Sequence, residues 1–146
     1  MTIKDSRAYK YAVWASQDSS GKVGRYVRKQ CAEWLKAVED GYVDAQEWNK
    51  ITALLKAIQH PDLGRDMYSS LEDYSLLFIY AVLCTKTDGK LYYSTGLLEI
   101  ARKNYKTFTA AVIFIIGMLT LPRFSRLFSV APDLKLTREL KVAIKK

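Results

Sequence analysis

The 146-residue chain has little cysteine, little proline and one histidine. Its two cysteines, Cys31 and Cys84, are too few and too far apart for a disulfide framework, and no metal-ligand spacing accompanies them. We expect both to be reduced, buried thiols. His60 stands beside Pro61 without a cysteine or acidic cluster, so a loop role is favoured over a metal or catalytic one. With 49% hydrophobic residues and three prolines, the composition excludes a disordered chain.

Long hydrophobic runs are also missing. The first residues, MTIKDSRAYKYAVW, contain no apolar run behind a basic segment, so we expect no signal peptide and a cytoplasmic location. Residues 107–121 carry no charge but fall short of the ~20 residues that span a bilayer. They also lack the charged opposite face of a helix that lies on a membrane surface. The sequence therefore predicts a buried helix and no membrane partner.

Acidic residues are outnumbered, with 15 Asp and Glu against 23 Lys and Arg, giving a net charge of +8. A chain this basic attracts polyanions, which makes nucleic acid the favoured partner. The alternative is a solvated basic surface with no specific partner. The same two interpretations apply to the basic residues near the C-terminus, which either face DNA or form a solvated helix face: Arg123, Arg126, Lys135, Arg138, Lys141, Lys145 and Lys146.

The first half of the chain has helical periodicity. Between Lys22 and Asp40 one face carries Val27, Cys31, Trp34, Leu35 and Val38, and Gly41 is placed to end that helix. Asp44 is a candidate cap for a second helix, whose stripe is Ile51, Leu54, Leu55 and Ile58 and which stops before His60 and Pro61. A third helix is predicted to begin at Ser70, with Asp73 as its capping partner.

The second half has the order expected of an α/β protein. Asp88 and Gly89 predict a tight turn, and the Tyr, Leu and Ile of 91–100 predict a strand. A helix over 108–121, a second strand over 124–130 and a last helix capped by Asp133 come next. This order implies a parallel strand pair with a right-handed crossover. The expected fold class is therefore α/β, with a helical N-terminal lobe over 1–68 and an incomplete parallel sheet over 69–146.

A basic loop lies between the first predicted strand and the helix. It reads Arg102, Lys103, Asn104, Tyr105, Lys106 and Thr107. Lysine followed by threonine at a helix start, directly after a strand, is typical of a phosphate-binding loop, because helix amides and the helix dipole then face the phosphates. The strict motif has glycine at the positions of Ile100 and Tyr105. Taken by itself, the loop sequence therefore fits either a phosphate-binding loop or a Lys-Thr pair that occurs at a helix start by chance.

The run from Leu98 through Thr107 to Ala111 resembles the variant Walker A segment of phage terminase large subunits, the ATP-driven DNA-packaging motors. Similar resemblances occur in the same order at 11–14, 27–38, 88–89 and 129–133. The resemblance implies that 69–146 form the first part of a P-loop NTPase core, with ATP and Mg²⁺ as cofactors. It implies double-stranded DNA, portal protein and small terminase subunit as partners in the host cytoplasm. It implies that Lys106 binds the β- and γ-phosphates, that Thr107 ligates Mg²⁺ and that Arg102 approaches the phosphates.

Two positions differ from that family. Tyr105 stands where the family often has glycine, and a bulky residue loses easy access to positive φ. Tyr74 lies where an aromatic residue near the adenine is expected, but Ser75 replaces the family's glutamine. Tyr74 is therefore either a stacking partner for the base or a core aromatic.

The chain shows no Walker B strand and no nuclease carboxylate cluster. We therefore assign no catalytic residue and expect ATP binding without turnover by this chain alone. We also expect the unfinished sheet to expose apolar surface and to self-associate. The alternative function is a non-enzymatic basic module that contacts nucleic acid or protein, in which Lys103 and Lys106 contact phosphate of nucleic acid and no nucleotide is bound.

Overall fold

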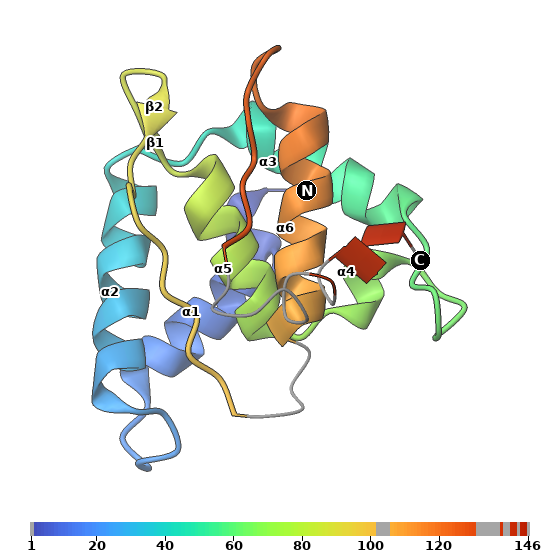
Figure 1. Cartoon of the computed structure of the whole chain (residues 1–146). Helices are drawn as coiled ribbons and strands as arrows, with labels where there is room; N and C mark the ends of the chain where they lie inside the picture. Colours follow the sequence, from blue (N-terminus) through green and yellow to red (C-terminus); the bar gives the residue numbers. More distant parts are fainter. Residues whose placement is uncertain (1, 102–105, 131–137, 139–140, 143, 146) are drawn as a thin grey trace. The chain divides into compact units, whose positions relative to one another are not determined.

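The computed structural model describes residues 2–101, 106–130, 138, 141–142 and 144–145. The chain divides into two compact units, Met1–Gly96 and Leu97–Lys146 (Figure 1). The first unit contains a short 3-10 helix, five α-helices and a small hairpin. Its helices are η1 (Ile3–Asp5), α1 (Arg7–Gln17), α2 (Arg25–Glu39), α3 (Ala45–Ala57), α4 (Met67–Ser70) and α5 (Asp73–Cys84). The second unit contains α6 (Lys106–Thr120).

Local capping explains where most of these helices begin and end. The Asp44 side chain accepts hydrogen bonds from the backbone amides of Gln46 and Glu47, which confirms the predicted start of α3. Helix α2 ends before Gly41, whose φ of 79° is the left-handed conformation that favours glycine. The amides of Gly41 and Tyr42 then bond to Val38 and Ala37, which closes the helix end as predicted.

The predicted helix start at Ser70 is wrong. Ser70 is the last residue of α4, and α5 begins at Asp73 with Glu72 as its N-cap. The cause is a long-range contact from α1. The Arg7 guanidinium donates hydrogen bonds to the carbonyl oxygens of Tyr68 and Leu71, at 2.8 and 2.9 Å, and to the Asp73 carboxylate at 2.8 Å. These bonds fix the break between α4 and α5, which no local capping pattern reveals.

An aromatic stack forms the core of the first unit. The Trp48 ring stacks on Tyr80 with 3.7 Å between centroids, and Trp34 lies 6.1 Å from Trp48 on the other side. The Tyr80 hydroxyl shares a 2.6 Å hydrogen bond with Thr52, so burying it leaves no unpaired polar group. On α1, small residues face inward and let this helix pack closely on α2: Ala8, Ala12 and Ala15.

The predicted turn at Asp88 and Gly89 is confirmed, with φ of 50° and 72°. It joins β1 (Lys86–Thr87) to β2 (Lys90–Leu91) in an antiparallel pair. Both central residues have positive φ, as two-residue hairpin turns require.

The expected α/β class is wrong. In the described residues the chain is mostly helical, its sheet is the two-stranded antiparallel hairpin, and no parallel sheet is present. Neither predicted strand, 91–100 or 124–130, forms as a strand beyond Leu91. Around Gly96 the backbone lies against α5 instead. The packing is so close that a Cβ atom on Gly96 would lie 3.2 Å from the side chains of Phe78 and Val82. Close packing on a helix has replaced the strand pairing that a sheet requires.

Candidate functional site

The Lys-Thr pair of the predicted phosphate loop opens helix α6. Lys106 is the first residue of the 15-residue helix, Thr107 is the second, and both are exposed. The helix over 108–121 was therefore predicted correctly in kind, and it begins two residues earlier than expected. Residues 108–120 of α6 carry no charge and are mainly apolar. Only the first turn of the helix is therefore suited to polar chemistry.

The first turn of α6 is electrostatically suited to an anion. The first amides of an α-helix have no partner within the helix, and the helix dipole places partial positive charge there. Helix α6 has no acidic residue in its first turn to offset that charge, and Lys106 adds a full positive charge. This differs from α3, where Asp44 caps the amides and Glu47 lies in the first turn.

The remaining loop residues of the prediction lie outside the described residues. They are Arg102, Lys103, Asn104 and Tyr105. Asp133, Lys135 and Lys146 lie outside them as well. The assignments made for these residues stay predictions. Of the basic residues near the C-terminus that are described, Arg123, Arg126, Arg138, Lys141 and Lys145 are all exposed.

Tyr74, the predicted adenine contact, is the second residue of α5 and is half-buried. Its neighbour across the helix pair is Tyr11 of α1, whose pKa is raised by burial and, to a lesser degree, by Cys31, Tyr74 and Asp73. Tyr74 thus lies within electrostatic reach of Tyr11 in the first unit. Lys106 and Thr107 belong to the other unit, so a joint site for adenine and phosphates stays a prediction.

Arg7 is a residue that sequence reasoning missed. Its guanidinium holds the start of α5, where Tyr74 lies, through the Asp73 carboxylate, and it also lies 5.7 Å from the Tyr68 ring centroid. Asp73 is 66 positions away in the chain, so no local signal identifies the pair. An arginine with no acidic residue three or four positions away on its own helix was the one available hint.

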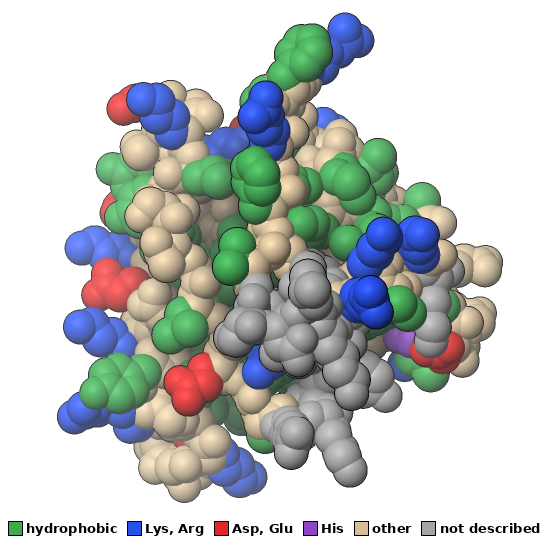
Figure 2. Space-filling model, in the orientation of Figure 1, with side chains coloured by type: hydrophobic (Ala, Val, Ile, Leu, Met, Phe, Trp, Pro, Cys, Tyr) green, Lys and Arg blue, Asp and Glu red, His purple; other side chains and the backbone are tan. Residues whose placement is uncertain are grey.

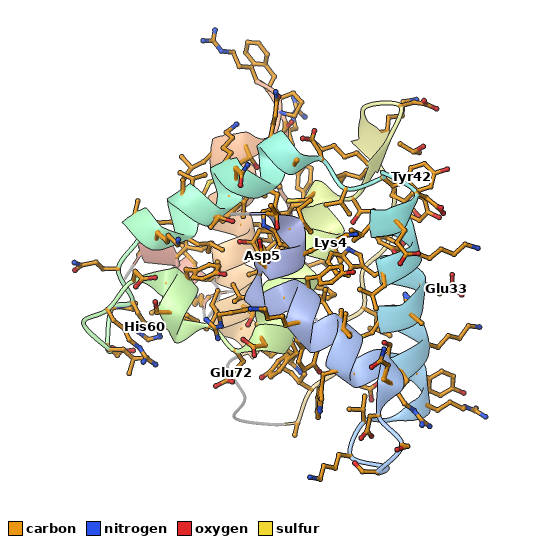
Figure 3. All side chains as sticks on the ribbon, turned by 180° about the vertical axis from the view of Figure 1, so that it is seen from behind. Lys4, Asp5, Glu33, Tyr42, His60 and Glu72 are labelled. Atoms are coloured by element: carbon orange, nitrogen blue, oxygen red, sulfur yellow. The ribbon has the colours of Figure 1, made fainter. Side chains whose placement is uncertain are left out.

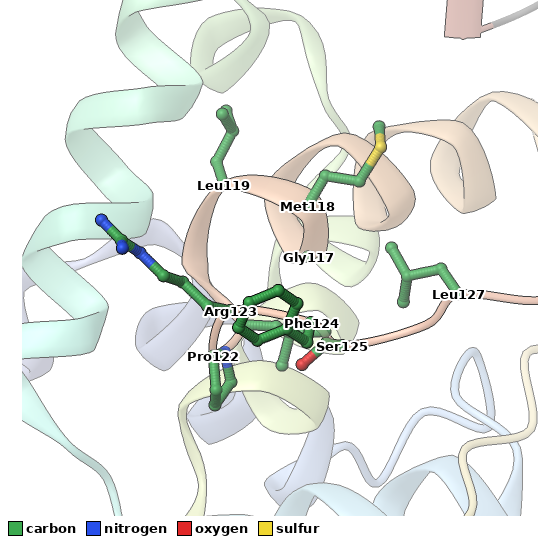
Figure 4. A pocket seen from close by; sticks show the side chains of 9 residues that line it. Gly117, Met118, Leu119, Pro122, Arg123, Phe124, Ser125 and Leu127 are labelled. Carbon is green, nitrogen blue, oxygen red and sulfur yellow. The ribbon is translucent and has the colours of Figure 1, made fainter.

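After α6 the chain turns back on itself. The Ser125 amide bonds to the Pro122 carbonyl, and Phe124 adopts a φ of 68°. The Leu127 side chain then packs against α6 at Gly117. A Cβ atom on Gly117 would lie 3.6 Å from it. These residues surround an open hollow of about 480 Å³ that is lined mainly by apolar groups and Arg123 (Figure 4). The hollow offers no set of convergent polar groups, so it is not a catalytic centre.

The thiols and the histidine have structural positions. Cys31 and Cys84 are free and buried, as predicted, and burial raises the pKa of Cys31 to about 11. A thiol with so high a pKa is a poor nucleophile at neutral pH. His60 lies in the loop after α3 (Figure 3), where its Nδ1 accepts hydrogen bonds from the amides of Asp62 and Leu63. It holds this loop together.

Two further searches bear on the site. Among the described residues, no group of three or more His, Cys, Asp or Glu side chains is placed to hold a metal ion. Within that same part of the chain, no helix has the length and apolarity to cross a membrane. Comparisons of the chain with family models, curated proteins and solved structures found no match.

Proposed function

We propose that the loop ending in Lys106 and Thr107 binds the phosphates of ATP, and that the chain is the nucleotide-binding part of a DNA-packaging ATPase of the phage large terminase type. The observation that carries the proposal is that Lys106 and Thr107 are exposed residues in the first described turn of α6. The motif requires a helix N-terminus at this residue, because its amides and its lysine must face the same phosphates. The strand that precedes such a loop in the motif is not formed by the described residues 92–101, so the helix is the part of the motif that supports the proposal.

In this proposal the two described loop residues have separate tasks. The Lys106 ammonium binds the outer phosphates as a point charge, and the Thr107 hydroxyl ligates the Mg²⁺ that bridges them. Arg102 approaches the phosphates from the loop, and Lys103, Asn104 and Tyr105 complete it. Double-stranded DNA, a portal protein and a small terminase subunit are the proposed partners, and the host cytoplasm is the proposed location.

Calorimetric titration of ATP with Mg²⁺ into the chain tests this function. We expect Lys106→Ala to weaken binding by about 10- to 100-fold, since a hydrogen bond to a charged group contributes about 1.5–3 kcal/mol. Lys141→Ala is the matched control, because Lys141 is exposed, lies in the same unit and carries the same charge. Equal weakening by both variants, or no binding by a folded chain, would contradict the proposal.

The magnesium role of Thr107 has its own test. Thr107→Val removes the hydroxyl and keeps the shape of the side chain, whereas Thr107→Ser keeps the hydroxyl. We expect the valine variant to lose the Mg²⁺ dependence of ATP binding and the serine variant to retain it. Unchanged Mg²⁺ dependence in the valine variant would remove Thr107 from the site.

A second candidate is a nucleotide-free module that binds nucleic acid. The uneven charge distribution favours it: residues 97–146 contain ten Lys and Arg and three Asp and Glu, whereas residues 1–96 contain 13 and 12. Under this candidate, the chain binds DNA, and ATP with Mg²⁺ neither binds nor changes the DNA affinity. The same calorimetry therefore separates the two candidates.

A further inference from the structure

A second basic surface lies in the first unit, away from the loop in sequence. It consists of Lys22, Arg25, Arg28 and Lys29, at the start of α2 and in the loop before it. No acidic residue occurs between Ser19 and Ala32, although the first unit as a whole is nearly balanced in charge. Figure 2 shows lysine and arginine side chains along α2, with acidic side chains between some of them.

Three of these four cations are exposed to solvent and form none of the ion pairs found among the described residues. Lys22, Arg25 and Lys29 are exposed. The ion pairs among the described residues are Arg7 with Asp73 and Lys86 with Glu47, and neither involves this surface. Arg25 instead lies over the ring of Tyr26, 4.9 Å from its centroid, and donates a 3.0 Å hydrogen bond to the Tyr26 hydroxyl, and Tyr26 is 75% exposed. The surface thus presents cations and a hydroxyl-bearing ring to solvent.

The fourth cation and one carboxylate hold the surface in place. Arg28 donates a 3.0 Å hydrogen bond to the carbonyl oxygen of Asp18. The Asp18 carboxylate accepts from Ser20 and from the amide of Val23, and these bonds lower the pKa of Asp18. Both Asp18 oxygens are therefore committed to the loop. Lys22 lies on a loop that these bonds hold in place, so the loop backbone loses little conformational entropy when Lys22 binds a partner.

The charges on this surface repel one another. Cations within the first turns of a helix meet the positive end of its dipole, whereas acidic residues are favoured there. Three other helices of the first unit do have an acidic residue at their start: Asp44 at α3, Asp66 at α4 and Asp73 at α5. A concentration of like charge that reduces stability in the free protein is relieved when a dense polyanion binds.

We infer that Lys22, Arg25, Tyr26 and Lys29 form a contact surface for the phosphate backbone of double-stranded DNA. Duplex DNA carries one negative charge per ~1.7 Å of axis, twice the density of a single strand, and so suits cations this closely spaced. Lysine, arginine and tyrosine are all common donors to phosphate oxygens. The surface reads no bases, so it fits a partner that must be held in any sequence. None of its residues belongs to the loop that ends in Thr107, so either proposal can fail without the other.

Salt-dependent binding of a fluorescent mixed-sequence duplex to the whole chain tests the inference. Each phosphate contact adds about 0.9 to the slope of log affinity against log salt, so the triple variant K22Q/R25Q/K29Q is expected to reduce the slope by about 2.7. The control is K4Q/K36Q/K50Q, which removes the same charge from exposed positions of the same unit. We expect the control to reduce the slope by much less than one contact.

Thermal melts followed by circular dichroism check that both triple variants fold. Equal slopes for the two variants, or a slope unchanged by K22Q/R25Q/K29Q, would overturn the inference. Tighter binding of the single strand than of the duplex would do the same. In a second experiment, Tyr26→Phe removes only the hydroxyl. A modest fall in duplex affinity, with the salt slope unchanged, would support a phosphate contact from Tyr26, and an unchanged affinity would remove Tyr26 from the surface.

Discussion

The two units of this chain differ in what their residues are used for. In Met1–Gly96 the charges nearly balance, and many polar side chains bond to the protein itself, as Arg7, Asp18, Asp44 and Asp66 do. In Leu97–Lys146 positive charge predominates, and an apolar helix opens with an exposed Lys106 and Thr107. The difference teaches that many polar side chains of the first unit have partners within the protein, whereas the described basic residues of the second unit are exposed.

The largest expected effect comes from the aromatic stack of the first unit. Trp48→Ala removes a ring that lies 3.7 Å from Tyr80 and is 2% exposed. We expect a loss of about 3–5 kcal/mol in the free energy of unfolding, the usual cost of such a cavity. Urea denaturation measures it. Trp14→Ala is the control, because Trp14 is 52% exposed, and a comparable loss there would contradict the assigned core.

A smaller effect is expected at the link between α1 and α5. Arg7→Lys keeps the charge but cannot reproduce three directed hydrogen bonds to Tyr68, Leu71 and Asp73. Because the Arg7 side chain is 37% exposed, water replaces part of what is lost, and we expect about 1–2 kcal/mol in urea denaturation. If Arg7→Lys were as stable as the wild type, the break between α4 and α5 would need another cause.

The N-cap of α3 is expected to matter less. Asp44→Ala leaves the amides of Gln46 and Glu47 without their side-chain acceptor and should cost about 1 kcal/mol. Asp44→Asn retains an acceptor and should recover most of the loss. Thermal unfolding of the three proteins compares them, and identical melting of the alanine variant would show that the cap contributes nothing.

The smallest effect is a dependence on pH. The hydrogen bonds from Ser69 hold the pKa of Asp66 below its ordinary value. A group with a lowered folded-state pKa contributes stability above its unfolded pKa and loses it as the pH falls through the folded pKa. Asp66→Asn should therefore lower stability slightly at neutral pH, where the carboxylate contributes, and make the fall in stability toward acid pH less steep. An unaltered acid limb would show that the Asp66 carboxylate is not selectively stabilised.

Sequence reasoning succeeded where the cause was local. Asp44, Gly41 and the Asp88-Gly89 turn act through their own neighbours, and all three predictions are confirmed. It failed where distant residues decide. Arg7 sets the start of α5 from 66 positions away, and the segment near Gly96 packs on Phe78 and Val82 instead of pairing as a strand. A strand needs a partner, and residue preferences along one segment cannot supply it.

The candidate site rests on a local pattern, a Lys-Thr pair at the start of a helix. The described part of α6 opens with Lys106 and Thr107, and what this pair binds stays a prediction. The role of Tyr74 depends on how distant parts of the chain meet, which a pattern does not determine. The basic surface on α2 was missed because its residues were read for their apolar face, which draws attention to Cys31 and Trp34 and away from Arg25 and Lys29.

The most direct test of the central claim is a titration of the isotope-labelled chain with ATP and Mg²⁺, monitored through the amide resonances in two-dimensional NMR. The account predicts that the largest shifts occur at Lys106 and Thr107, in the first turn of α6, and that Thr120 at its other end shifts little. The same titration of the Lys106→Ala variant should show these shifts only at much higher nucleotide concentration. Shifts confined to Met1–Gly96, or a folded chain whose amides at Lys106 and Thr107 do not respond, would contradict it.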